Sequence, residues 1–228
     1  MNTKQQAAVR ALDFVRDGMV IGLGTGSTTS YFINMLGERI RSGSLVDIRG
    51  VPTSEHSTRR AQSLGIPLVT LADYPEIDLA VDGADEVDPN LNLIKGMGRA
   101  LLREKIVEIH ARLFLVIVDG SKLVPRLGVR SPLPVEIVPF EVVASLRWLS
   151  SLGCQTELCH KNDGSPVVTD NGNYLATCRF RNGISDPYKL ALQLAMRPGI
   201  VEHGLFLDMA GRAIVADADG TRILERRK

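Results

Sequence analysis

The sequence predicts an α/β protein, in which a parallel sheet covered by helices on both faces is followed by a smaller α+β lobe. Three observations support this prediction. Short apolar runs alternate with helical patterns over the first half of the 228 residues, as in β-α-β units. Most of those runs end in a polar or glycine-rich step. Four prolines between Pro125 and Pro139 then mark a connection between two units.

In the first half, apolar runs predict strands and amphipathic stretches predict helices. The expected strands are Met19–Leu23, Ile48–Val51, Pro67–Thr70, Leu79–Val81 and Leu113–Val118. The expected helices are an N-terminal helix that carries Lys4, then Thr29–Arg41, Glu55–Leu64 and Arg99–His110. Ligands of open parallel sheets bind outside the carboxyl ends of the strands, so we expect the polar steps to converge on one edge.

The pattern changes beyond the prolines. The expected elements there are helices at Phe140–Leu152 and Pro187–Met196 and short strands at Gln155–Cys159, Val167–Val168 and Tyr174–Arg179. We expect two tail segments, Leu205–Asp208 and Ala213–Asp217, to return as strands to the first domain. The predicted domains are therefore residues 1–128 plus 205–228, and a small lobe of residues 129–204.

Composition limits the possible functions. The chain is 44% hydrophobic and 23% charged, as in ordinary soluble globular proteins. A net charge of +1 without a long basic run argues against nucleic acid as a partner. We expect no membrane association, because neither a secretory signal nor a long apolar run is present. The cysteines Cys154, Cys159 and Cys178 lack C-x-x-C spacing, which favours a cytoplasmic protein with reduced thiols.

The segment Gly22–Thr28 lies between an expected strand and an expected helix. Its glycines permit a sharp turn, and free N–H groups at a helix start attract an anion. Hydroxyls of Thr25, Ser27 and Thr28 add donors, although a plain capped turn is the alternative. The P-loop spacing is absent, Ser27 replaces the third glycine of the dinucleotide fingerprint, and no acid ends the second strand. The loop therefore favours a sugar phosphate.

Two lysines are candidates for the same anion. Lys122 directly follows an expected buried strand, and Lys4 approaches from the N-terminal helix. The alternative for each lysine is a solvated surface charge.

Acids gather after the strand Leu79–Val81. Asp82 and Asp85 lie three residues apart in a turn, so both can face one small ligand and share proton transfer. Lys95 can bind a carbonyl or hydroxyl oxygen, and the glycines that follow it can direct backbone N–H groups at a developing negative charge. A metal site is also conceivable for these acids, but no calcium-loop pattern is present and Lys95 would oppose a cation.

Glu104 follows on the helix expected at Arg99–His110. The expected buried stripe of this helix is Leu102, Ile106, Ile109 and Leu113. Glu104 lies off that stripe, so we expect it to project towards the loops, the alternative being an ordinary solvated acid. The acids expected at the surface are Glu86, Asp88 and Glu108.

Together these segments resemble one family, ribose-5-phosphate isomerase type A. The matching segments, in family order, are Gly24–Thr28, Asp82–Glu86, Lys95–Gly96, Arg103–Lys105, Asp119–Lys122, Pro134–Glu136, Val168–Asn173 and Val201–Phe206. The resemblance implies a cofactor-free enzyme of the pentose phosphate pathway that interconverts D-ribose 5-phosphate and D-ribulose 5-phosphate. It also implies a Rossmann-like domain with a ferredoxin-like lobe, and a homodimer or homotetramer.

The resemblance assigns roles to the residues that match. Glu104 is implied as the base that moves a proton between C1 and C2, and Asp82, Asp85 and Lys95 as helpers that bind sugar oxygens and open the ring. The implied phosphate-binding residues are Thr25, Gly26, Ser27, Thr28 and Lys122. The further expected substrate contacts are Lys4, Gly83, Ala84, Gly96, Met97 and Gly98.

One departure from the family pattern lies inside this region. The family usually reads Lys-Gly-Gly-Gly followed by a small residue, whereas this chain reads Lys95-Gly-Met97-Gly-Arg99. If the replaced glycine has φ > 0, Met97 requires the loop to rearrange. Arg99 places a cation at a helix start, where the dipole is unfavourable. This departure motivates two alternatives: a sugar-phosphate sensor without activity, and an isomerase or deaminase of another phosphosugar.

Overall fold

The computed structural model describes residues 1–226, which form two compact units. The first unit comprises Met1–Ala84, Arg103–Lys122 and the chain from Asp208 onward. The second comprises Asp85–Leu102 and Leu123–Leu207. The predicted fold class is confirmed, since a parallel sheet occurs together with smaller antiparallel sheets. The predicted domain boundaries stay a prediction.

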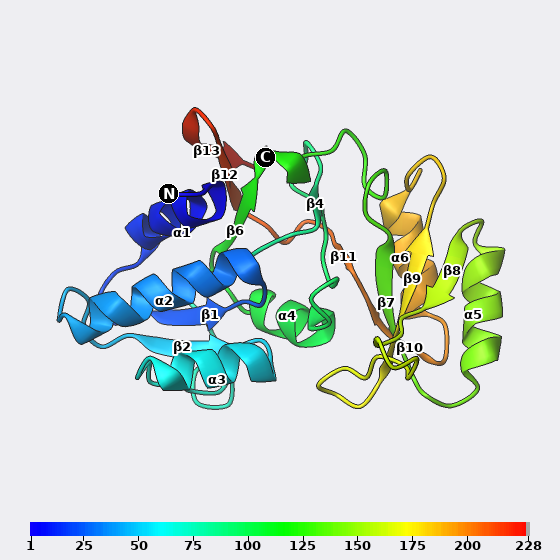
Figure 1. The fold of residues 1–228 in the computed structure, drawn as a ribbon, viewed down its shortest axis with the longest axis horizontal. Coiled ribbons are helices and arrows are strands. Elements are labelled where there is room, and N and C mark those ends of the chain that lie inside the picture. The colour runs from blue at the N-terminus through cyan, green and yellow to red at the C-terminus, as the bar shows by residue number, and fades with distance from the viewer. Residues whose placement is uncertain (227–228) are drawn as a thin grey trace. The chain divides into compact units, whose positions relative to one another are not determined.

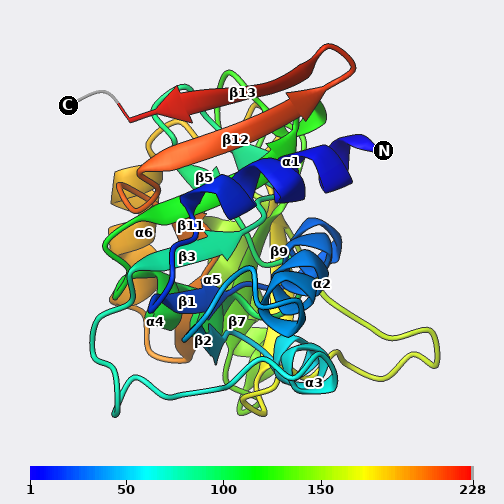
Figure 2. The ribbon, with the colours of Figure 1, turned by 90° about the vertical axis from the view of Figure 1, so that its left-hand side faces the viewer.

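The first unit is built on a six-stranded sheet with the order β13-β12-β6-β3-β1-β2 (Figures 1 and 2). The strands are β1 (Val20–Leu23), β2 (Arg49–Pro52), β3 (Leu79–Asp82), β6 (Phe114–Asp119), β12 (Arg212–Asp217) and β13 (Gly220–Glu225). The first five are mutually parallel, and β13 is an antiparallel edge strand. The carboxyl ends of β1, β2, β3 and β6 therefore lie along one edge of the sheet, as predicted.

Helices cover both faces of this sheet because successive side chains of a strand point to opposite faces. Ile21 and Leu23 pack with α1 (Thr3–Ala11) and α2 (Ser27–Arg41), which Figure 2 shows in front of the strands. Val20 points to the other face, where it packs with Val107 of α4 (Leu101–Glu108). The remaining helical segments of the unit are η1 (Leu12–Phe14), α3 (Glu55–Ser63) and η2 (Gly120–Lys122).

The second unit contains two antiparallel sheets. Its four-stranded sheet has the order β10-β7-β9-β8 and its three-stranded sheet the order β11-β5-β4. The strands are β4 (Glu86–Val87), β5 (Leu93–Ile94), β7 (Leu133–Ile137), β8 (Gln155–Leu158), β9 (Tyr174–Arg179), β10 (Ile200–His203) and β11 (Leu205–Phe206). Helices α5 (Val142–Ser151) and α6 (Pro187–Ala195) share a core with the four-stranded sheet.

Two predicted strands are wrong. Residues 67–70 form only an isolated bridge between Leu68 and Gly50, because Pro67 has no N–H and the chain turns from Leu71. Val167–Val168 likewise forms a single bridge, from Val168 to Tyr174. Both segments follow the edge of a sheet over too few residues to extend a ladder.

The central strand β7 was missed because its prolines predict a connection. Pro134 is opposite Gly204, the residue that directly follows β10, and its C=O accepts a hydrogen bond from Gly204 N–H at 2.8 Å. Proline is tolerated here because the hydrogen bond that its missing N–H would donate is not needed. The C=O of Gly204 is already occupied by Lys95 N–H at 2.9 Å, so the absent proline N–H leaves no acceptor without a donor there. The prediction for the tail is right for β12 but wrong for β11, which pairs with β5 in the second unit.

No helix within residues 1–226 combines the length and the apolar character that crossing a membrane requires.

Candidate active site

The glycine loop after β1 leads directly into α2. A Cβ at Gly24 would lie 2.1 Å from Cγ of Asp82, so only glycine fits there. Gly26 has φ of 132° and precedes the helix, which begins at Ser27. Within the described chain no side chain caps this helix start. The first N–H groups of α2 therefore point out of the helix as anion donors.

Asp82, the last residue of β3, holds this loop in place through hydrogen bonds. The carboxylate is fully buried, and its Oδ1 accepts from Thr25 N–H at 3.0 Å, Thr29 Oγ1 at 2.9 Å and Gly83 N–H at 2.7 Å. These three donors stabilise the carboxylate. The structure thus gives Asp82 a supporting position beneath the loop, and its predicted catalytic role stays a prediction.

Hydroxyl groups continue along the same edge of the sheet. Thr25 Oγ1 donates to Ser54 Oγ at 2.7 Å and lies 2.9 Å from Thr53 Oγ1. The predicted site did not include Thr53 and Ser54, although the polar end of the second expected strand was a signal for them. Both are buried, so they fix the rotamer of Thr25 from below.

Two of the predicted cations belong to this unit. Lys4, near the start of α1, donates from Nζ to Ser27 Oγ at 2.8 Å. Lys122 ends η2, the turn that follows β6. Its ammonium makes no hydrogen bond or ion pair with the described residues. Thr28 is half-buried on the first turn of α2, so hydroxyls and positive charge gather around this helix start.

Glu104 is buried, with 2% of its surface exposed. The predicted stripe of α4 is wrong, since Ile106 and Ile109 are exposed and the buried face carries Leu101, Glu104, Val107 and Glu108. The helix is thus rotated about its axis relative to the prediction. Val107 fixes this rotation because it packs against β1, where a Cβ on Gly22 would lie 3.0 Å from its Cγ1.

Glu104 lies one turn before Val107 and therefore on the same face of α4. The helix is also tied to the start of α3 by an ion pair of 3.0 Å between Arg103 and Glu55. Glu104 is consequently a carboxylate held on the sheet-facing side of a helix whose packing is fixed, rather than a solvated acid.

The second unit contains the other candidates. Met97 N–H donates to Oδ2 of Asp85 at 3.0 Å, so the two predicted turns are in contact. Lys95 is buried, and its Nζ lies 5.3 Å from the ring centre of Phe206. Gly96 has φ of 112°, and a Cβ there would lie 2.8 Å from a side-chain carbon of Leu101.

Where the chain departs from the family pattern, the residue with positive φ is not the one that we expected. Met97 is not among the residues with positive φ, so it fits the loop without left-handed strain. Arg99 instead has φ of 71°, a conformation that favours glycine. Its guanidinium is exposed and makes no hydrogen bond or ion pair with the described residues. Met97 and Arg99 line a small cavity together with Glu157, Cys159 and His160.

The prediction of surface acids is wrong for Glu86 and Glu108, whereas Asp88 is half-buried. Glu86 is fully buried, and its carboxylate accepts from the N–H groups of Gly128, Arg130 and Ser131 at 2.5 to 2.6 Å. Glu108 is buried on α4. Asp88 accepts from the N–H groups of two residues in its own turn, Asn90 and Asn92. The positions of Glu86 and Asp88 are explained by backbone N–H groups that need an acceptor. The pattern of apolar residues does not reveal which N–H groups these are.

The candidate residues thus form two sets, one in each unit. The first unit contains Lys4, Thr25, Gly26, Ser27, Thr28, Asp82, Gly83, Ala84, Glu104 and Lys122. The second contains Asp85, Lys95, Gly96, Met97 and Gly98. Within residues 1–226 no group of three or more His, Cys, Asp or Glu has the arrangement of a metal site.

Comparison with known proteins gives these two sets a context. Residues 49–220 match the family model described as ribose 5-phosphate isomerase A (phosphoriboisomerase A). The chain belongs to the ribose 5-phosphate isomerase A family.

Family members are similar over nearly the whole chain. A ribose-5-phosphate isomerase A of Roseiflexus castenholzii is 51% identical over 97% of this chain and 94% of its own. A structure of a D-ribose-5-phosphate isomerase in complex with phospho-erythronic acid has a TM-score of 0.96 and 47% identity, covering 99% of this chain and 100% of its own. Ribose 5-phosphate isomerase from Plasmodium falciparum has a TM-score of 0.96 and 37% identity, covering 99% of each chain. As a ribose 5-phosphate isomerase A family member, the chain is an isomerase.

Proposed function

We propose that this isomerase interconverts D-ribose 5-phosphate and D-ribulose 5-phosphate through an enediolate, with Glu104 as the base, in the non-oxidative pentose phosphate pathway. The observation that carries the proposal is the buried position of Glu104 on α4, in the same unit as a glycine loop and a helix start that no side chain of residues 1–226 caps. A buried carboxylate and an anion site are the two groups that a phosphosugar isomerase needs.

The phosphate is proposed to bind at the start of α2. Its oxygens would accept from the free N–H groups of the first helical turn and from Thr25, Ser27 and Thr28. Lys4, already hydrogen-bonded to Ser27 at 2.8 Å, and Lys122 would balance its charge. Because the loop is held from beneath by Asp82, it is organised before the substrate arrives.

Glu104 is proposed to carry the proton. In the open aldose, the carboxylate removes the proton from C2, α to the C1 carbonyl, and the resulting enediolate spreads the charge over O1 and O2. Protonation at C1 by the same carboxyl group then gives the ketose, while a second proton moves from O2 to O1. Both hydrogens move as protons, with no net oxidation or reduction of the sugar, so the proposed reaction needs no cofactor.

Asp85 and Lys95 are proposed to serve the sugar end of the same substrate. The Lys95 ammonium would stabilise the negative enediolate oxygen. Asp85, oriented by Met97 N–H at 3.0 Å, would accept from a hydroxyl and assist ring opening together with Asp82. Asp82 and Asp85 are three residues apart, so the chain keeps their Cα atoms within about 11 Å of each other.

The ligand named in one similar structure supports a phosphosugar as substrate. That isomerase is in complex with phospho-erythronic acid, a phosphorylated sugar acid. A carboxylate presents two oxygens on one planar carbon, as an enediolate presents O1 and O2 on a planar carbon pair. A site that binds both a phosphate and such a planar group matches the proposed intermediate.

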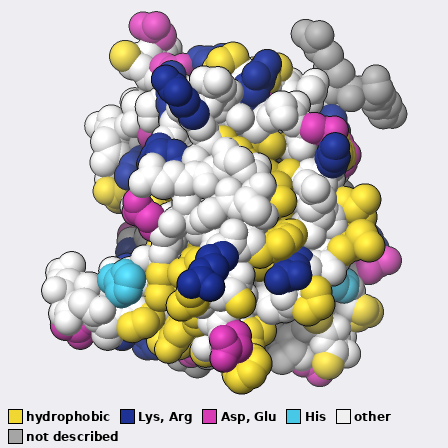
Figure 3. Space-filling model, turned by 90° about the vertical axis from the view of Figure 1, so that its right-hand side faces the viewer, with side chains coloured by type: hydrophobic (Ala, Val, Ile, Leu, Met, Phe, Trp, Pro, Cys, Tyr) yellow, Lys and Arg dark blue, Asp and Glu magenta, His cyan; other side chains and the backbone are white. Residues whose placement is uncertain are grey.

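We further propose that the chain forms a homodimer or homotetramer in the cytoplasm. Large apolar side chains are exposed at Tyr188 and Leu192 of α6 and at its C-cap residue Met196, which lie four residues apart on one face. Phe140 and Val143 are exposed at the start of α5. Figure 3, viewed from the side on which α5 lies, shows hydrophobic side chains gathered around lysines and arginines. Surfaces of this kind are typical of protein–protein contacts.

The test combines turnover with binding for Glu104→Gln and a matched control. Glu108→Gln alters the next buried acid of the same helix, one turn on. We expect Glu104→Gln to lose at least about 10²-fold in kcat while it binds ribose 5-phosphate with unchanged affinity. Glu108→Gln should retain its kcat.

Substrate choice is measured on the same protein with pentose and hexose phosphates. Turnover restricted to ribose 5-phosphate and ribulose 5-phosphate is expected. Binding of these sugars without any turnover by the wild type would instead favour a sensor, and preference for a different phosphosugar would contradict the proposed substrate.

A further inference from the structure

Two cysteines of the second unit lie together. Cys154 and Cys178 are both free and buried. Thr156 Oγ1 lies between them, 3.5 Å from Sγ of Cys154 and 3.8 Å from Sγ of Cys178. This arrangement follows from the register, because Thr156 of β8 is directly opposite Cys178 of β9 and Cys154 precedes Thr156 by two residues on the same side.

The two thiols differ in acidity. The pKa of Cys154 is lowered, chiefly by a hydrogen bond from the Cys178 thiol and then by one from Thr156, against the opposing effect of burial. The pKa of Cys178 is raised well above its usual range by the same hydrogen bond and by burial. Cys154 therefore has the character of an attacking thiolate and Cys178 that of its hydrogen-bonded partner. In its thiol form, Cys154 can instead donate to the Leu149 carbonyl at 3.2 Å.

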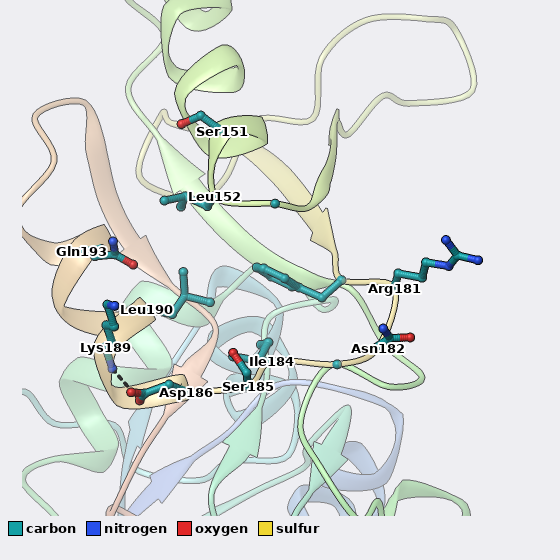
Figure 4. Close-up of a pocket in the computed structure, with 13 residues that line it drawn as sticks. Ser151, Leu152, Arg181, Asn182, Ile184, Ser185, Asp186, Lys189, Leu190 and Gln193 are labelled. Atoms are coloured by element: carbon teal, nitrogen blue, oxygen red, sulfur yellow. Dashed lines mark hydrogen bonds between the residues drawn. The ribbon is translucent and has the colours of Figure 1, made fainter.

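A cavity of about 540 Å³ is lined by residues that flank both cysteines in the sequence, although by neither cysteine itself (Figure 4). Its wall includes Gly153, the residue before Cys154, and Phe180, two residues after Cys178. Figure 4 shows Ser151 and Leu152 at one side of the cavity and Ile184 and Ser185 at the other. A small oxidant in this cavity would therefore lie beside Gly153, the residue directly before Cys154.

We propose that Cys154 and Cys178 form a reversible intramolecular disulfide when the protein meets hydrogen peroxide. The Cys154 thiolate attacks one peroxide oxygen, the O–O bond breaks, and hydroxide leaves and is protonated to water, which gives a sulfenic acid. The Cys178 sulfur then attacks that sulfur, the S–O bond breaks, the S–S bond forms, and a second water leaves with the Cys178 proton. Two thiols are oxidised by two electrons, and one peroxide is reduced to two waters.

The bond requires Cys154 to move towards Cys178, and Cys154 lies outside the strand ladder. A disulfide requires an S–S distance of about 2.05 Å and Cα atoms roughly 4.4 to 6.8 Å apart. Cys154 precedes β8 and follows Gly153, whose φ is 85°, so the strand ladder does not fix its position. Its sulfur can therefore move to Cys178 while the pairing of Thr156 with Cys178 stays intact.

The bond would close a loop within the second unit. Residues 154–178 contain β8, β9 and the turn whose Thr169, Asn171 and Asn173 all donate to the buried Glu136 at 2.8 to 3.1 Å. Closing a loop of this length constrains the unfolded chain, so the oxidised protein should be more stable. Dithiothreitol would reverse the change by thiol exchange.

The test uses the full-length protein and the third cysteine as an internal control. After mild peroxide treatment, unfolding and alkylation, we expect Cys159 to be alkylated and Cys154 and Cys178 to be protected. Peptide mapping should show one 154–178 cross-link, which dithiothreitol removes. The thermal midpoint should rise by several degrees on oxidation and fall again on reduction.

Two variants complete the design. Cys159→Ser should form the cross-link as the wild type does, and Cys178→Ser should not form it. If Cys178→Ser fails to fold, the wild-type peptide map decides alone. Cross-links that include Cys159, links between chains, or irreversible oxidation of Cys154 without a cross-link would overturn the proposal.

Discussion

Single residues of this molecule have an unfavourable backbone conformation or charge environment that the composition does not reveal. Arg99 is the clearest case, because a cationic side chain occupies a left-handed backbone position with φ of 71°, two residues before the start of α4. Left-handed backbone costs roughly 1–2 kcal/mol for a residue with a side chain. The helix dipole adds a further unfavourable contribution.

Replacement of this residue by glycine should therefore stabilise the protein. We expect Arg99→Gly to raise the free energy of unfolding by roughly 0.5–1 kcal/mol, because relief of strain exceeds the greater freedom of glycine in the unfolded chain. Arg99→Lys is the control, since it keeps both the charge and the backbone strain and should give no gain. Urea unfolding measures the difference, and a loss of stability in Arg99→Gly would show that the guanidinium makes a contact that matters.

A second pair of substitutions separates support of the glycine loop from binding to the phosphate. Thr29→Val removes the hydroxyl that donates to Asp82 at 2.9 Å and should lower the free energy of unfolding by about 1–2 kcal/mol. The neighbouring Thr28→Val should leave stability almost unchanged but raise KM, because Thr28 is proposed to bind the phosphate directly. Equal effects of the two variants on both quantities would contradict this division.

At the scale of the element, the rotation of α4 decides which acid is buried. Val107, rather than Ile106 or Ile109, packs against the sheet. Val107→Ala should therefore destabilise the protein by roughly 1–3 kcal/mol. Ile109, 68% exposed, should tolerate glutamine within about 0.5 kcal/mol. The reverse order in chemical denaturation would show that α4 is rotated as the apolar pattern predicts, with Glu104 off the buried face.

At the scale of the whole molecule, the exposed stripe on α6 bears on assembly. Leu192, 63% exposed, lies at its centre. Leu192→Glu would bury a charge at each contact between copies and should shift the light-scattering mass towards the monomer. Gln193→Glu, about 100° round the helix axis from Leu192, introduces the same charge off the stripe and should leave the mass unchanged. A monomeric wild type would contradict the proposed homodimer or homotetramer.

The sequence predicted those features of the fold that repeat along the chain. The parallel strands of the first unit, their helices and the polar steps at their ends follow from periodicity and were predicted. The strand β7 was not, because Pro134 is permitted only by the ending of β10 and the contact with Gly204, which are tertiary facts.

The candidate site was predicted unevenly for the same reason. Glycines and hydroxyls of the loop at Gly24–Thr28 follow a local pattern, whereas the burial of Glu86 depends on N–H groups more than forty residues away. The burial of Glu104 was missed because Ile106 of α4 and Ile109, just after it, are apolar but exposed, which moved the expected stripe off its true face. The pattern of apolar residues identifies the buried face of a helix only where the exposed face is polar. The exposed face of α4 is partly apolar.

The most direct test of the central claim is isomerisation of ribose 5-phosphate in deuterated water. If Glu104 transfers a proton through an enediolate, the ribulose 5-phosphate formed by the wild type should contain solvent deuterium at C1, detectable by NMR. Glu104→Gln should abolish both product formation and incorporation of deuterium, while Glu108→Gln preserves both. A wild-type product free of deuterium after many turnovers, or a Glu104→Gln variant that incorporates it at the wild-type rate, would contradict the account.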